Sequence, residues 1–211
     1  MKAKVNMRTW NVCTMFVPHK AAQIAKEMRR YGTEVLGIYK SRWNGSGLTK
    51  LSTGESIIYS NNVTQTISTS TLSFGVAIMM SRTASKALIQ WEPLISTIRI
   101  MTAKFHSKGR KVTIIQCYAP TNNADEEKEE LYRQPQSVLD RTPVGNIEIL
   151  MGEMNAKLGA DNTGREPIMG REVLSEMNEN GELFADFCAF NDLVIGSSVY
   201  KHKDIHKATW V

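Results

Sequence analysis

The chain has 211 residues, 42% hydrophobic and 22% charged, which is enough for one soluble domain with a substantial buried core. No apolar run approaches the roughly 18 residues of a membrane span, and charges interrupt the first residues, where a signal peptide has its apolar core. We therefore expect a single domain over residues 1–211, intracellular (nuclear or cytoplasmic) and without a membrane partner. The formal net charge is +5.

The first part of the chain predicts strand, helix, strand and turn. Residues 5–12 can form a strand, and apolar side chains then recur at helical spacing from Ala21 to Tyr31, before a helix stop at Gly32. Val35–Tyr39 is a continuous apolar run with the length of a buried strand, and the glycines of residues 44–47 are typical of a turn.

The central part predicts further strands and one hairpin. Residues 56–60 and 74–80 are strand-like, and residues 84–89 are expected to form a short helix. Over residues 98–103, Ile98, Ile100 and Thr102 alternate with Arg99, Met101 and Ala103, as in a strand. Residues 107–110 can then form a turn that leads to a second strand over 112–118. This pattern indicates a β-hairpin.

The last part predicts helices and short strands. Residues 124–140 look helical, but an interior Pro135 costs about 3 kcal/mol, so we expect this helix to kink or end early. A strand over 147–151, a loop over 152–164, a helix from Asn178 or Asn180 and a strand over 193–195 follow. Together the elements predict an α/β (α+β) fold with mixed sheets and outer helices.

Charge is distributed unevenly along the chain. Residues 1–50 hold ten Lys and Arg against two acidic residues, and residues 81–111 hold seven against one, whereas residues 121–211 hold nine against seventeen. A basic half of this kind would attract a polyanion such as nucleic acid. An ordinary solvated surface is the alternative that composition leaves open.

The three cysteines, Cys13, Cys117 and Cys188, are far apart in the sequence and lack the paired spacing of metal ligands. Their odd number and spacing predict neither a disulfide framework nor a zinc site. We expect all three to be buried thiols.

Polar side chains follow apolar strands at four places, which are residues 10–12, 39–43, 116–121 and 151–155. Loops held by a rigid sheet can bring such side chains together. Glu153 and Asn155 would point to the same side of an extended segment, and Asn11 could add a carbonyl oxygen. Oxygen ligands suit Mg²⁺. Strand-end capping or turn formation is the alternative for each place alone.

Taken together and in this order, these segments resemble the exonuclease-endonuclease-phosphatase superfamily, and in particular the endonuclease domain encoded by non-LTR retrotransposons. The resemblance includes Thr9-Trp-Asn-Val12 and Ile115-Gln-Cys-Tyr-Ala-Pro-Thr-Asn122. The other matching segments are residues 28–32, 34–38, 42–43, 150–152, 155–157, 159–162, 177–181, 185–188 and 206–210. The resemblance implies a four-layer sandwich of two mixed β-sheets flanked by helices, with the active site at one end of the sheets.

The resemblance also implies roles for individual residues. Asn11 matches a metal-site asparagine, Tyr118 a phosphate-binding tyrosine, and Asn155 an asparagine that orients the nucleophile or the phosphate. Glu153 stands where the family has its catalytic aspartate, and Lys40 stands where the family has its metal-binding glutamate. We thus expect Glu153, Asn155, Tyr118 and Asn11 as catalytic residues, with Asn11 and Glu153 as the remaining ligands of a Mg²⁺ or Mn²⁺ ion.

The two substitutions predict weak or absent cleavage. A lysine ammonium cannot coordinate Mg²⁺ and repels it. The extra methylene of Glu153 displaces the carboxylate, and a misplacement of about 1 Å can cost roughly 10²-fold in rate. We further expect Lys40 to pair with Glu153 in the vacated metal position.

Compared with the family, the sequence stops after residues 206–210, before the closing strands that carry further catalytic residues, so it predicts a domain incomplete at its C-terminus and marginally stable. Four interpretations stay open at this point. The chain could be a metal-dependent DNA endonuclease, a module that binds DNA weakly without cutting it, a non-functional gene fragment, or part of a longer protein.

Overall fold

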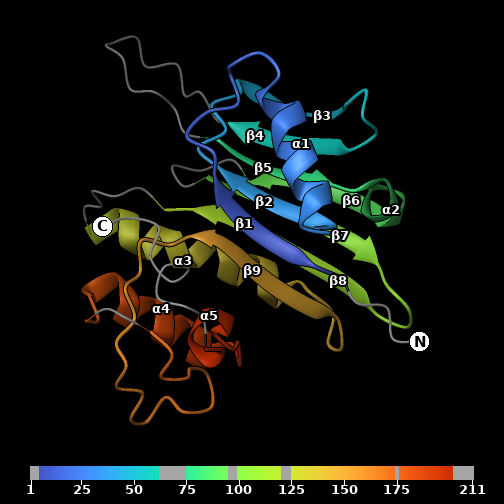
Figure 1. Ribbon diagram of the computed structural model, residues 1–211. Coiled ribbons are helices and arrows are strands. Elements are labelled where there is room, and N and C mark those ends of the chain that lie inside the picture. Colours follow the sequence, from blue (N-terminus) through green and yellow to red (C-terminus); the bar gives the residue numbers. More distant parts are fainter. Residues whose placement is uncertain (1–4, 62–74, 95–98, 120–124, 174–175, 202–211) are drawn as a thin grey trace. The chain divides into compact units, whose positions relative to one another are not determined.

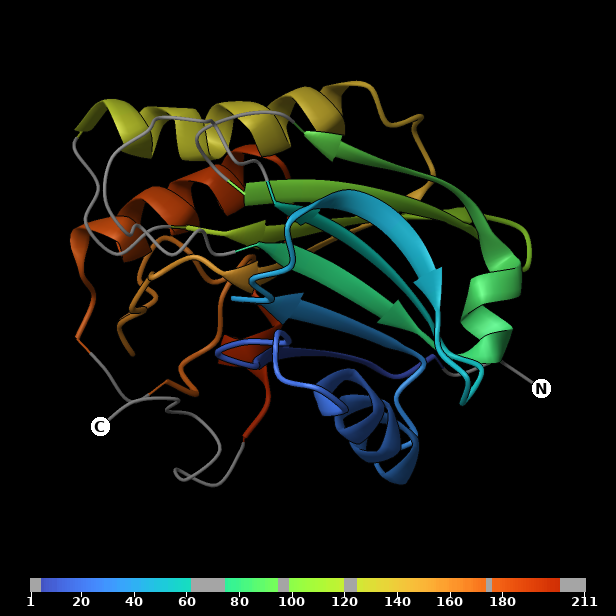
Figure 2. The ribbon, with the colours of Figure 1, turned by 90° about the horizontal axis from the view of Figure 1, so that it is seen from above.

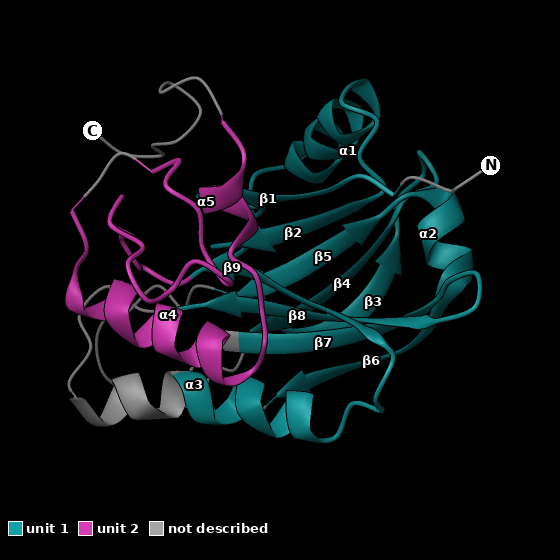
Figure 3. Ribbon diagram, turned by 90° about the horizontal axis from the view of Figure 1, so that it is seen from below, with its two compact units in different colours: residues 1–119, 125–153 teal, residues 120–124, 154–211 magenta. Residues whose placement is uncertain are grey.

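The computed structural model describes residues 5–61, 75–94, 99–119, 125–173 and 176–201. Its elements run from β1 near the N-terminus to α5 (Figure 1). The chain forms two compact units, one of residues 1–119 and 125–153 and one of residues 120–124 and 154–211 (Figure 3).

The first sheet lies in the first unit and has the strand order β1-β2-β5-β4-β3. β1 and β2 are parallel, and the other neighbours are antiparallel, so the sheet is mixed. All five residues of β2 and of β5 are buried, as their continuous apolar runs predict. The strands are β1 (Met7–Asn11), β2 (Val35–Tyr39), β3 (Gly45–Lys50), β4 (Ser56–Asn61) and β5 (Val76–Met80).

The second sheet, also in the first unit, has the order β6-β7-β8-β9. The predicted hairpin forms between β7 and β8, and β9 pairs with β8 in parallel, so this sheet is mixed too. The strands are β6 (Leu88–Leu94), β7 (Arg99–His106), β8 (Lys111–Tyr118) and β9 (Ile147–Glu153).

The two sheets face each other across a core to which both contribute, with Ile58 and Ile78 from the first sheet and Met101 and Ile114 from the second. Helix α1 (Lys20–Arg30) covers the outer face of the first sheet, and helix α3 (Asp125–Asp140) lies on the far side of the second (Figure 2). The four layers and the two mixed sheets confirm the predicted fold class.

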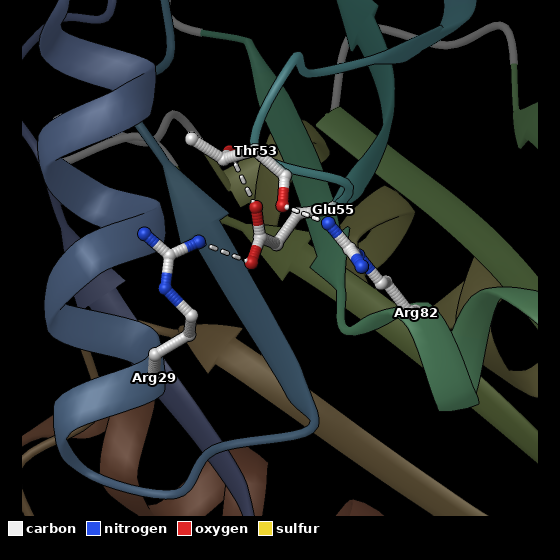
Figure 4. Close-up of polar contacts among 4 residues, drawn as sticks. All are labelled: Arg29, Thr53, Glu55 and Arg82. Atoms are coloured by element: carbon white, nitrogen blue, oxygen red, sulfur yellow. Dashed lines mark hydrogen bonds and ion pairs between the residues drawn. The ribbon is translucent and has the colours of Figure 1, made fainter.

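A polar cluster ties α1 to the loop between β3 and β4 and to α2 (Arg82–Ala87). The carboxylate of Glu55 accepts hydrogen bonds from Arg29 and from the Thr53 hydroxyl, and Arg82 donates to the Thr53 carbonyl at 2.9 Å (Figure 4). Only 5% of the Glu55 side chain is exposed. The cluster therefore fixes the end of the first sheet at which β2 begins.

Two strands of the structure were not predicted. The turn predicted at residues 44–47 is wrong, because Gly45 and Gly47 begin β3 and pair with β4. At Gly47 a side chain would lie 2.9 Å from the Tyr59 hydroxyl, so glycine makes room for that ring. The predicted helix over 84–89 ends at Ala87, and the chain continues as β6, which contains Pro93.

Three further predictions need correction. Helix α3 runs through Pro135 to Asp140 and does not end early, since one missing hydrogen bond does not outweigh the rest of the helix. β9 continues through Gly152 to Glu153, so the loop begins two residues later than expected. Residues 193–195 form no strand, because they find no partner strand among the described residues; Ile195 donates one hydrogen bond to Ile168.

The second unit holds α4 (Glu179–Phe190) and the short α5 (Gly196–Val199). Asn178 caps α4 as predicted, accepting a hydrogen bond from the Gly181 amide at 2.8 Å. None of the helices in the described ranges is long and apolar enough to cross a membrane.

The cysteines are only partly as predicted. Cys117 and Cys188 are buried, and burial raises the pKa of Cys188 to about 12. Cys13 is exposed, because it lies in the turn that leaves β1 instead of in the core.

Candidate active site

Four candidate or neighbouring residues lie at the carboxyl ends of two parallel strand pairs. In the first sheet, Asn11 at the end of β1 is paired with Tyr39 at the end of β2. In the second sheet, Tyr118 at the end of β8 is paired with Glu153 at the end of β9, and the Glu153 carbonyl accepts a hydrogen bond from the Ala119 amide at 2.8 Å. Parallel pairing thus places each pair at one edge of its sheet.

An aromatic stack joins the two sheets at this edge. The rings of Tyr39 and Tyr118 lie 5.9 Å apart, centroid to centroid, and are nearly parallel, with an interplanar angle of 9°. Both side chains are buried, with 4% and 3% exposed. Because the stack links the strand pairs, Asn11, Tyr39, Tyr118 and Glu153 belong to one site within the first unit.

Glu153 is hydrogen-bonded to a residue that the sequence did not single out for a role. The Tyr39 hydroxyl donates to the Glu153 carboxylate. Burial, and then the negative charge of Glu153 and this hydrogen bond, raise the pKa of the Tyr39 hydroxyl above its ordinary range. Tyr39 therefore stays a neutral donor to Glu153 at physiological pH.

Lys40 follows Tyr39 directly and lies beside the same stack. Its ammonium nitrogen is 5.7 Å from the centroid of the Tyr118 ring, a cation–π distance. Its backbone adopts the left-handed conformation, with φ at +61°. The structure thus places a positive charge next to the predicted phosphate-binding tyrosine, while the predicted pairing of Lys40 with Glu153 stays a prediction.

The loops that leave β1 and β2 are conformationally restrained. Cys13, Lys40 and Arg42 all have positive φ without being glycine, a conformation that costs about 1–2 kcal/mol and persists where the surroundings impose it. The side-chain oxygen of Asn11 accepts a hydrogen bond from the Cys13 amide at 3.0 Å. Asn11 therefore shapes this turn, which is the capping role that its position in the sequence left open.

Gly152 brings β9 close to β8 immediately before Glu153. Its φ is +137°, and a side chain there would lie 1.9 Å from the Cys117 carbonyl oxygen. Only glycine fits such a close approach of two backbones. The position of Glu153 thus depends on this contact.

The residues at the site do not fit a divalent cation. Glu153 is the single carboxylate at the ends of β8 and β9, the Asn11 oxygen accepts a hydrogen bond from the Cys13 amide, and Lys40 brings a positive charge. Within the described ranges, no group of three or more His, Cys, Asp or Glu side chains could hold a metal. Mg²⁺ and Mn²⁺ are bound through carboxylates and other oxygens that are available for coordination.

Asn155, the remaining predicted site residue, belongs to the second unit. Its φ is +51°, and its carbonyl accepts hydrogen bonds from the side chains of Asn178 at 3.2 Å and Asn180 at 3.5 Å. These bonds fix the Asn155 backbone to the start of α4. Its role in the site stays a prediction, and the segment 206–210 lies outside the described residues.

No protein-family model matches the chain. Craniofacial development protein 2 from Tragulus javanicus is 31% identical over 203 residues, a match that covers 96% of this chain and 33% of the relative. The chain thus spans about a third of the length of the curated relatives that it matches.

Two solved structures share the fold. The 3′ phosphatase NExo from Neisseria, bound to a product DNA hairpin, is matched with a TM-score of 0.58 and 15% identity, over 88% of this chain and 71% of that one. The endonuclease domain of TRAS1, a telomere-specific non-LTR retrotransposon, is matched with a TM-score of 0.51 and 12% identity, over 89% and 71%. Nearly the whole chain is therefore homologous to about a third of craniofacial development protein 2, and it has the fold of the endonuclease/exonuclease/phosphatase proteins, which it shares with such a protein from Leptotrichia buccalis (TM-score 0.50, 14% identity, over 73% of this chain and 67% of that one).

Proposed function

We propose that this chain is a DNA endonuclease domain, derived from a non-LTR retrotransposon, whose metal-dependent cleavage step is impaired. The observation that carries the proposal is which side chains occupy the site. Lys40 lies over Tyr118, and the single carboxylate at the ends of β8 and β9, Glu153, accepts a hydrogen bond from Tyr39. The fold shared with a phosphatase bound to DNA and with a retrotransposon endonuclease supports DNA as the substrate class.

The residues that remain still suit the handling of a phosphodiester. Tyr118 and Lys40 offer a hydroxyl and an ammonium to phosphate oxygens, and Glu153 offers a carboxylate that can orient water. A divalent ion, when bound, would stabilise the charge that develops on the phosphate, which Lys40 can do only in part. We therefore infer contact with the DNA backbone and little cleavage.

Plasmid nicking tests this proposal. Supercoiled plasmid is incubated with Mg²⁺ or Mn²⁺ and with the natural chain, with a Lys40→Glu, Glu153→Asp variant, or with a Lys26→Glu variant. Lys26 is an exposed residue of α1, so its replacement controls for the change of charge alone. We expect nicking above background from the double variant only. Nicking by the natural chain at a comparable rate would show that cleavage is not impaired.

A second candidate function is nucleic-acid binding by a module that was never a nuclease. An exposed cationic cluster of the first unit favours it. The guanidinium carbons of Arg8 and Arg30 lie 5.2 and 5.4 Å from the centroid of the Tyr31 ring. Gel-shift titration at increasing salt decides this point, because phosphate contacts weaken steeply as salt rises. Binding that does not respond to salt would exclude both functions.

A further inference from the structure

The loop that connects β1 to α1, residues 12–19, exposes two consecutive apolar side chains beside the candidate site. Phe16 is 67% exposed and Val17 is 56% exposed. We propose that these two side chains form an apolar wedge that inserts between neighbouring base pairs of DNA bound at the site. This inference rests on the proposed function, which supplies DNA as the ligand, and it gives the loop a part in recognising that DNA.

Hydrogen bonds hold the loop on both sides of the wedge. The Phe16 amide donates to the Thr14 hydroxyl at 3.0 Å, and the Val17 carbonyl accepts from the Lys20 amide at 3.1 Å. Met15, directly before the wedge, is 3% exposed and packs in the core under α1. A wedge needs such support, because a side chain presented on a fixed backbone loses little conformational freedom when it binds.

Met15 also ties this loop to the loop that leaves β2. Its amide donates a hydrogen bond to the Ser41 carbonyl at 2.8 Å. Ser41 lies between Lys40 and Arg42 in the sequence. Phe16 therefore follows a residue that is fixed to the basic segment of the candidate site.

The charge of the two loops fits a polyanion. Lys40, Arg42 and Lys20 flank the wedge, whereas residues 5–26 and 35–54 contain no aspartate or glutamate. The first turn of α1, which begins directly after the loop, has no acidic residue either. An apolar tip surrounded by cations matches a ligand with a phosphate backbone outside and apolar base faces inside. A neutral protein partner would gain nothing from these cations.

Insertion of the wedge has a consequence for the choice of DNA. A side chain such as phenylalanine enters a duplex by separating two stacked base pairs, and its ring then stacks on a base. Unstacking is least costly where a base pair is already mismatched. The phosphate contacts are the same in a matched and a mismatched duplex of equal length. The wedge therefore predicts a preference for the mismatched duplex.

The test is the affinity for two labelled duplexes, one matched and one with a central mismatch, measured by fluorescence anisotropy in EDTA so that no cleavage occurs. We expect the natural chain to bind the mismatched duplex about 10-fold more tightly, the effect of about one stacked base. Phe16→Ser should lose this preference and keep most of its affinity for the matched duplex. Phe16→Trp retains an aromatic ring and should keep the preference.

The control is Phe190→Ser. Phe190 is 80% exposed and ends α4 in the second unit, so the variant loses an exposed phenylalanine at another place. It should leave the preference unchanged. A 2-aminopurine base next to the mismatch adds a direct signal of unstacking. Its fluorescence should rise with the natural chain and with Phe190→Ser, but not with Phe16→Ser.

The possible results separate the wedge from the proposed function. A preference that survives in Phe16→Ser, or its absence from the natural chain, would overturn the wedge and leave the DNA contact standing. Binding to phosphatidylserine vesicles that Phe16→Ser loses, with an unchanged DNA preference, would assign the loop to a membrane and also overturn the inference. Nicking by the natural chain would refute impaired cleavage alone, and binding to neither duplex would refute both proposals.

Discussion

The two ends of the first sheet hold a glutamate in different ways. At the end where β2 begins, Glu55 is paired with a cation, Arg29, and with the Thr53 hydroxyl. At the end where β2 finishes, Glu153 accepts a hydrogen bond from the neutral Tyr39, and the nearby cation Lys40 lies over an aromatic ring.

The difference indicates different uses. A buried carboxylate paired with arginine and threonine is compensated, and it contributes to the connection between α1, the β3–β4 loop and α2. A half-buried carboxylate held by a tyrosine is an arrangement that changes of one or two residues can alter. We infer that the Glu55 end connects structural elements, whereas the Glu153 end holds the candidate site, and four predictions address this comparison.

The largest effect is expected at Gly152, because the site end depends on backbone contact. Gly152→Ala would bring a side chain against the Cys117 carbonyl and should lower the free energy of unfolding by on the order of 3 kcal/mol, measured by urea denaturation. Gly145→Ala is the control: its φ is also positive, at +91°, but no described atom lies within 4 Å of the new side chain. Similar losses for both variants would show that the close contact is unimportant.

A smaller effect is expected at the opposite end. Arg29→Ala leaves Glu55 buried with one donor fewer and should cost about 1–2 kcal/mol of unfolding free energy. Arg30→Ala, one residue further, removes an exposed pair with Glu27 and an exposed cation–π contact with Tyr31, and should cost about 1 kcal/mol or less. The measurement is thermal and urea unfolding of both variants. Equal losses of unfolding free energy in Arg29→Ala and Arg30→Ala would show that the Glu55 cluster does not stabilise the fold.

The same end should make stability depend on acid pH. Burial acts to raise the pKa of Glu55, but the hydrogen bonds from Thr53 and Arg29 outweigh it and lower this pKa. A lowered folded-state pKa gives stability that is present above the unfolded value, near 4.5, and is lost as the pH falls through the folded value. The difference in unfolding free energy between the natural chain and Glu55→Gln should therefore shrink on acidification. A constant difference from pH 6 to pH 3 would contradict this.

The smallest effect concerns DNA binding. Arg8→Ala and Arg30→Ala should each weaken the binding of a short duplex a few-fold and reduce its salt dependence by about one phosphate contact. The control is Lys50→Ala, which removes an exposed cation at the other edge of the first sheet. If all three variants lose the same affinity, the cluster at Tyr31 has no special part in binding.

The sequence predicts the elements whose patterns are unambiguous. β2 and β5 are continuous apolar runs, and α4 has an asparagine cap before an apolar stripe. β3 was missed because glycines are typical of turns, yet two of them lie in a strand where they make room for Tyr59. β6 was missed because its own sequence pattern does not predict a strand. It forms a strand by pairing with its neighbour β7.

The candidate site was predictable only in part. The sequence places Asn11, Tyr118 and Glu153 at strand ends, and the structure gathers them at one edge of the first unit. It does not indicate that Tyr39 donates to Glu153, because that contact depends on how two sheets pack. The one available signal was the position of Tyr39, a polar-tipped side chain at the end of an apolar strand.

The stack of Tyr39 on Tyr118 also bears on the order in which the chain folds. It joins strands that are distant in sequence. Closing so long a loop costs conformational entropy before the contact can stabilise the chain. We expect the hairpin of β7 and β8 to form early and the tyrosine pair to form late. In a refolding experiment, the near-ultraviolet circular dichroism of the tyrosines should therefore recover no sooner than the far-ultraviolet signal of the strands.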